Sequence, residues 1–186
     1  MITNIVEAVQ KNLGYPALQK VDPNSQEVKD NAGRSSGEKL GQSAITAVLA
    51  ALVKFSRSDK GANYLISGDS EQNWLDLIFE AKQSEAVDKV AHYSNIPVQE
   101  AMGHMQKIAR EGVKLIYESV GDKPTAEKIK TYMKSQRHNI LLYLPAAMQM
   151  GDLLKDDSLD DRTNKMEGPI SNMMHKIENK FSGGGS

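Results

Sequence analysis

Apolar residues recur every three or four positions along most of this chain, which is the spacing of one face of an α-helix. The strongest pattern covers residues 38–56, where further apolar residues fill the space between the first set and leave almost no polar face. A helix that is apolar on nearly all sides is surrounded by other elements. We therefore expect residues 38–56 to form the central helix of the fold.

Other patterns predict further helices around this central one. They cover 2–13, a segment opened by Ser70, a segment opened by Ser84, 98–118, 124–134 and a last segment opened by Pro169. The polar residues 135–139 interrupt the apolar stripe of the 124–134 helix, and Pro145 kinks or restarts the helical segment that follows. No segment alternates convincingly at period two, so the sequence predicts an all-α fold, a compact multi-helix bundle.

Composition divides the chain into three parts. Residues 1–37 are an N-terminal helix followed by a long linker rich in Pro, Asn, Asp, Ser and Gly. Residues 38–155 are the helical domain. Residues 156–186 are an acidic loop, a C-terminal helix and a flexible Gly/Ser tail.

Residues 90–105 contain two helical patterns separated by a short turn, Ser94 to Pro97. In helix-turn-helix proteins the first helix packs against the second, whose N-terminal residues face the major groove of DNA. Val90 and Ala91 match the first-helix positions, and Ile96 matches the buried turn residue. The spacing predicts a helix-turn-helix-like corner.

The exposed residues of this corner are poorly suited to base recognition. A DNA-binding version would use Gln99, Lys107 and Arg110, and Gln99 is able to contact adenine. However, Glu100 repels phosphate and the first turn of the second helix has no basic residue. We favour a helical corner without DNA binding.

Charge and cysteine usage exclude several classes of protein. The net charge is −1, which argues against a dominant nucleic-acid partner or anionic-membrane partner. Basic residues outnumber acidic ones eight to four between residues 104 and 138, a pattern typical of a solvated helix surface. The chain has no Cys, which excludes disulfides and thiolate catalysis and fits a cytoplasmic protein. The most apolar run, residues 44–53, is about half the ~20 residues that a membrane span needs.

No set of side chains predicts a catalytic, cofactor-binding or metal site, and we expect neither a cofactor nor enzymatic activity. Five oxygen-bearing residues follow the spacing of an EF-hand loop: Asp156, Ser158, Asp160, Asn164 and Glu167. The position that requires glycine for the sharp turn is Asp161, so a solvated acidic loop is the preferred interpretation. The histidines have no metal-site spacing, and the serines have no nucleophile elbow.

The order of these parts resembles the YidB-like proteins, a family of bacterial helical proteins with a homeodomain-like arrangement. The resemblance covers residues 38–155 and rests on the Ala-rich helix, the corner at residues 90–105, the long helix and the segment Ile140 to Pro145. It implies a bacterial protein with a helical fold, and it implies no catalytic residues.

The sequence leaves three hypotheses for function. The first is a protein-interaction or self-association module, because the central helix is rich in Ala and the last helix rich in Met. The second is a helix-turn-helix DNA-binding protein. The third is a carrier of a small apolar ligand, held between the Ala-rich helix and residues 141–150.

Overall fold

The computed structural model describes residues 3–69 and 71–159. Every regular element in these ranges is a helix, which confirms the predicted all-α class. The α-helices are α1 (Ile5–Leu13), α2 (Ser36–Ser56), α3 (Asp59–Ile66), α4 (Trp74–Phe79), α5 (Gln83–Ser94), α6 (Val98–Val120), α7 (Ala126–Leu141) and α8 (Met150–Leu154). Short 3-10 helices are η1 (Asn31–Gly33), η2 (Glu80–Lys82), η3 (Ala146–Met148) and η4 (Asp157–Leu159).

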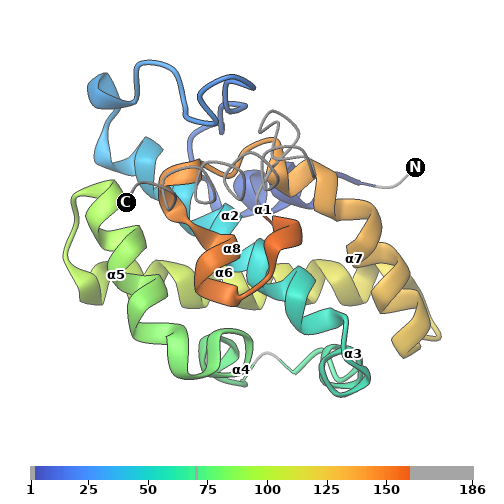
Figure 1. Cartoon of the computed structure of the whole chain (residues 1–186). Coiled ribbons are helices and arrows are strands. Elements are labelled where there is room, and N and C mark those ends of the chain that lie inside the picture. Colours follow the sequence, from blue (N-terminus) through green and yellow to red (C-terminus); the bar gives the residue numbers. More distant parts are fainter. Residues whose placement is uncertain (1–2, 70, 160–186) are drawn as a thin grey trace, which may run out of the picture.

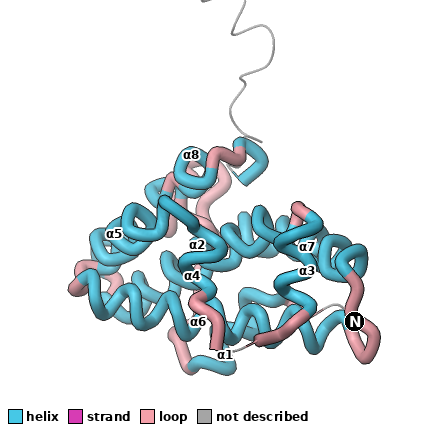
Figure 2. The backbone as a smooth tube through the Cα atoms, turned by 90° about the horizontal axis from the view of Figure 1, so that it is seen from below, coloured by secondary structure: helices cyan, strands magenta, loops and turns pink. Residues whose placement is uncertain are grey.

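Helix α2 is the centre of the fold, as its apolar pattern predicts. Each of its residues from 40 to 53 is buried, and it contacts every other α-helix of the described chain. Figures 1 and 2 show α5 on one side of α2 and α3 with α7 on the other. The helix begins with a capping box, in which Ser35 Oγ accepts from the Glu38 N–H at 3.2 Å and Glu38 Oε2 accepts from the Ser35 N–H at 2.8 Å.

Helix α1 packs onto the same hydrophobic core as α2. Ile5, Val6 and Val9 are buried against α2, α6 and α7, and the Ile5 N–H donates to Gln136 Oε1 at 3.0 Å. The loop after α1 is tied to the core by Gln42, whose side chain exchanges hydrogen bonds with the Gln19 backbone. The predicted domain boundary at residue 37 rests on composition and remains a prediction.

The predicted break in the helix after residue 134 is wrong, because α7 continues through residues 135–139 to Leu141. The polar residue that interrupts the apolar stripe, Gln136, is itself fully buried. Its side-chain oxygen accepts hydrogen bonds from Ile5 N–H and from Asn139, so a polar group occupies the core face of the helix.

Other helix starts also differ from the sequence predictions. Helix α5 begins at Gln83, directly after η2, so Ser84 lies inside the helix instead of opening it. Helix α4 begins at Trp74, and Ser70 lies outside the described residues. Helix α3 has no counterpart among the predictions, because it is short and contains Gly61 in its first turn.

The C-terminal part of the described chain is more ordered than the predicted acidic loop. The first residues of the predicted loop contain the η4 turn, in which Leu159 is buried. Helix α8 comes shortly before it, and its Leu153 and Leu154 are also buried in the core. The predicted helix after Pro169 and the Gly/Ser tail lie outside the described residues.

Residues 83–120 form a tight corner between α5 and α6. The left-handed conformation of Asn95 (φ 55°) ends α5, and the N–H groups of Asn95 and Ile96 both donate to the Ala91 carbonyl. Val90 and Met105 are buried, as the corner requires, while Ile96 is half-buried. The likeness of this corner to DNA-binding helix-turn-helix units remains a prediction.

Candidate functional site

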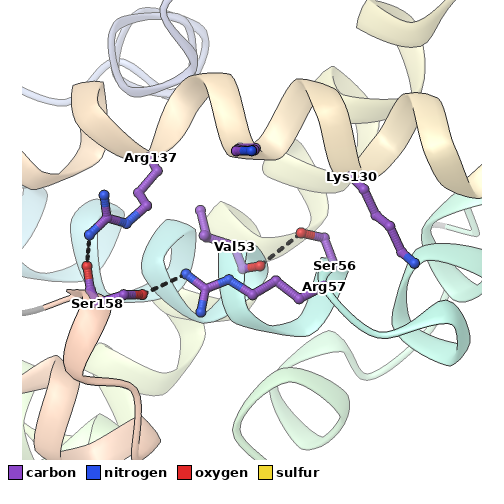
Figure 3. Close-up of a pocket in the computed structure, with 7 residues that line it drawn as sticks. Val53, Ser56, Arg57, Lys130, Arg137 and Ser158 are labelled. Atoms are coloured by element: carbon purple, nitrogen blue, oxygen red, sulfur yellow. Dashed lines mark hydrogen bonds between the residues drawn. The ribbon is translucent and has the colours of Figure 1, made fainter.

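A pocket of about 430 Å³ lies between the C-terminal end of α2, the middle of α7 and the η4 turn (Figure 3). In Figure 3, the side chains of Arg137 and Lys130 extend from α7 into the view, and Ser158 lies across from α7 on the η4 turn. The lining residues are Val53, Ser56, Arg57, Lys130, Lys134, Arg137 and Ser158. Four of these seven residues are cationic, which makes this pocket the strongest candidate site.

The helical register of α7 places its three cations on the pocket. Lys130, Lys134 and Arg137 are spaced by four and three residues, so they lie on one side of the helix. A neighbouring stripe, which includes Ile129 and Met133, is buried in the core. Burial of that stripe fixes the rotation of α7 and therefore the direction of its cationic side.

Helix α2 supplies the floor of the pocket and a fourth cation. Val53 and Ser56 are almost completely buried, and Ser56 Oγ donates to the Val53 carbonyl at 2.8 Å. This bond satisfies the hydroxyl within the helix, so the floor is mainly apolar. Arg57 follows at the end of α2, where its side chain extends along the pocket. The hydrocarbon stems of long basic side chains add further apolar surface.

Two of the four cations are paired with carboxylates. Arg57 Nη1 donates to Asp156, and Arg57 Nη2 donates to Ser158 Oγ at 2.7 Å. Lys130 Nζ donates to Asp59. The hydrogen bond and charge of Lys130 hold the pKa of Asp59 below its ordinary value, so this carboxylate stays ionised near neutral pH.

The other two cations are less fully satisfied. Lys134 is exposed and forms no ion pair within the described part of the chain. Arg137 Nη2 donates to the Ser158 carbonyl, whereas its Nε is buried and has no hydrogen-bond partner among the described residues. A buried donor without an acceptor costs about 1–3 kcal/mol. An anion in the pocket would be stabilised by the charge of Arg137 and by charge and hydrogen bonding from the exposed Lys134.

The structure brings together only two of the three nucleic-acid contacts that were predicted from the sequence. Gln99, Lys107 and Arg110 are all exposed on α6. Gln99 and Arg110 line a shallow depression of about 480 Å³, together with Glu71, and Lys107 lies outside it. The structure does not bring the three into one site.

Sequence reasoning missed the cationic pocket. The only sign of this pocket in the sequence is the helical spacing of Lys130, Lys134 and Arg137. The same spacing is typical of a solvated helix surface, so it does not predict a pocket. Arg57 and Ser158 join these residues only through tertiary structure, because 101 residues separate the two in sequence.

The described residues contain no group of three or more His, Asp or Glu side chains that could hold a metal ion. Asp156, the first residue of the EF-hand-like spacing, is engaged by Arg57 and by Ser158. The later positions of that spacing, Asp160, Asn164 and Glu167, lie outside the described residues.

No family model, curated protein or solved structure matches this chain. The resemblance to the YidB-like proteins therefore remains a prediction from the sequence. Among the described helices, none combines the length and apolar character needed to cross a membrane.

Proposed function

We propose that this protein is a non-enzymatic binding protein whose α2–α7 pocket holds a small organic anion. The observation that carries the proposal is that four cationic side chains line a pocket with an apolar floor, and that one of them, Lys134, forms no ion pair within the described residues. Guanidinium and ammonium groups bind carboxylates and phosphates through charge-assisted hydrogen bonds. The ligand class is accordingly a carboxylate or phosphate monoester attached to an apolar body.

The dimensions of the pocket fit such a ligand. A volume of about 430 Å³ lies within the usual range of small-molecule sites, about 300–1,000 Å³. The anionic head would lie among Arg57, Lys134 and Arg137, and the apolar body would rest on Val53. This proposal modifies the third hypothesis from the sequence, because the ligand is charged and lies against Lys130 to Arg137 instead of residues 141–150.

The described surface supports self-association less well than it supports binding of a small anion. Its exposed large apolar side chains are Tyr64, Val98 and Tyr117. Val98 and Tyr117 stand near opposite ends of α6, about 28 Å apart at the rise of an α-helix, so they do not form one patch. A protein partner, a bacterial origin and a cytoplasmic location remain predictions.

Titration of the full chain with phenyl phosphate and with octanoate tests the proposed function. Calorimetry would give the affinity, and backbone amide shifts would locate the site. We expect both anions to bind more tightly than phenol and 1-octanol, their neutral analogues, and to shift amides of α7 and the end of α2.

Matched lysine variants separate the pocket from general surface charge. Lys134→Met is expected to weaken phenyl phosphate binding about fivefold to tenfold, because it removes a cation that forms no ion pair with any other described residue. Lys107→Met removes the same charge from the exposed face of α6 and should change the affinity less than twofold. Equal losses in the two variants, or no binding by the wild-type protein, would contradict the proposed function.

A further inference from the structure

Residues 156–158 hold both arginines of the pocket from one side. The Asp156 carboxylate and Ser158 Oγ accept from the two terminal nitrogens of Arg57, and the Ser158 carbonyl accepts from Arg137. Figure 3 shows Ser158 between the two guanidinium groups. Residues 156–158 therefore offer three oxygen acceptors to Arg57 and Arg137: a carboxylate, a hydroxyl and a carbonyl. The oxygens of an anionic ligand would bind the same two arginines.

These contacts are weaker than those that a bound anion could make. A carboxylate or phosphate binds arginine best through two parallel N–H···O bonds, whereas Asp156 reaches one terminal nitrogen of Arg57 and a neutral hydroxyl reaches the other. The carbonyl that Arg137 contacts is also neutral. In addition, the Arg57 side chain is 45% exposed, although that of Asp156 is only 10% exposed, so water screens the ion pair from the Arg57 side.

The backbone of the 156–158 segment is held independently of the arginines. The Asp156 N–H donates to the Gly151 carbonyl at 2.8 Å, and the Leu159 N–H donates to the Asp156 carbonyl at 3.0 Å. Leu159 itself is buried in the core. Arg57 and Arg137 can therefore exchange their partners without unfolding the segment.

We propose that Asp156 is an internal competitor for the pocket: an incoming anion takes Arg57 from Asp156, so the 156–158 segment lowers the affinity for ligand. This inference rests on the proposed function and adds a means of regulation to it. A change that breaks the ion pair between Asp156 and Arg57 would strengthen the binding of the anion. Binding of the anion would in turn free the Asp156 carboxylate from Arg57.

The Asp156→Asn variant tests this competition, with phenyl phosphate as the probe. Removing the charge of Asp156 is expected to tighten phenyl phosphate binding about fivefold to tenfold, since the remaining amide is a weaker partner for Arg57. Asp152→Asn is the matched control, because Asp152 carries the same charge on the exposed side of α8 and should alter the affinity less than twofold.

A second measurement uses the wild-type protein, so it does not depend on the stability of a variant. On addition of phenyl phosphate, the carboxyl ¹³C resonance of Asp156 should shift, whereas that of Asp152 should stay unchanged. If wild-type protein binds phenyl phosphate but Asp156→Asn binds no better, or the Asp156 resonance does not move, the competition is refuted and the proposed function stands. If neither wild type nor Asp156→Asn binds, both are refuted.

Discussion

At the scale of single residues, two glycines that both lie within helices differ in whether a larger side chain would fit at their position. Gly61 and Gly103 both lie within helices. A Cβ atom at Gly61 would lie 1.8 Å from the Phe55 carbonyl oxygen, whereas a Cβ atom at Gly103 would meet nothing within 4 Å. The close approach of α3 to the end of α2 therefore depends on glycine at position 61, and no such constraint applies at 103.

Gly61→Ala and Gly103→Ala should change stability in opposite directions. We expect Gly61→Ala to lower the free energy of unfolding by about 3 kcal/mol, the upper part of the usual range for overpacking. Gly103→Ala should raise it by up to about 1 kcal/mol, because alanine is the better helix former. Urea denaturation of both variants measures the difference, and a tolerated Gly61→Ala would show that α3 can move away from α2.

At the scale of elements, the α5–α6 corner depends on one backbone conformation. Asn95 adopts a left-handed conformation that lets two consecutive N–H groups bond to the Ala91 carbonyl. Asparagine tolerates this conformation better than most residues, and glycine adopts it without steric cost. Asn95 therefore supplies the backbone turn of the corner, and the buried Val90, Ala101 and Met105 pack its two helices together.

Replacement of Asn95 by alanine or glycine isolates this conformational requirement. Asn95→Ala should destabilise the protein by about 1–2 kcal/mol, the cost of placing an ordinary residue in the left-handed region. Asn95→Gly should be neutral or slightly stabilising. Thermal and urea unfolding would report both values, and equal stability of the two variants would argue against strain at the corner.

At the scale of the whole molecule, helices that are distant in sequence share one core. Ile5 of α1 and Trp74 of α4 both belong to this core, and each is fully buried. A long loop separates α1 from α2, but the hydrogen bond from Ile5 N–H to Gln136 connects α1 to α7. This arrangement predicts that α1 unfolds together with the other helices.

Ile5→Ala tests that cooperativity, with the fluorescence of the single tryptophan, Trp74, as the readout. We expect a loss of about 3 kcal/mol, typical of truncating a buried isoleucine, and the same midpoint by fluorescence and by circular dichroism. Val98→Ala, at a position that is 43% exposed, should change stability by less than about 0.5 kcal/mol. If Ile5→Ala leaves the unfolding midpoint measured by Trp74 fluorescence unchanged, α1 unfolds separately from the other helices.

Hydrophobic periodicity was enough to predict the helical class and the central position of α2, because it directly records which face of a helix is buried. It also predicted the turn between α5, which ends at Ser94, and α6, which begins at Val98. The remaining features depend on contacts between segments that are distant in the sequence. Gln136 lies on the buried face of α7, where its side-chain oxygen accepts from the Ile5 N–H. The cationic pocket exists because packing brings Arg57 and Ser158 against α7. Periodicity describes each helix separately, whereas partners for buried polar groups come from segments that only the folded chain brings together.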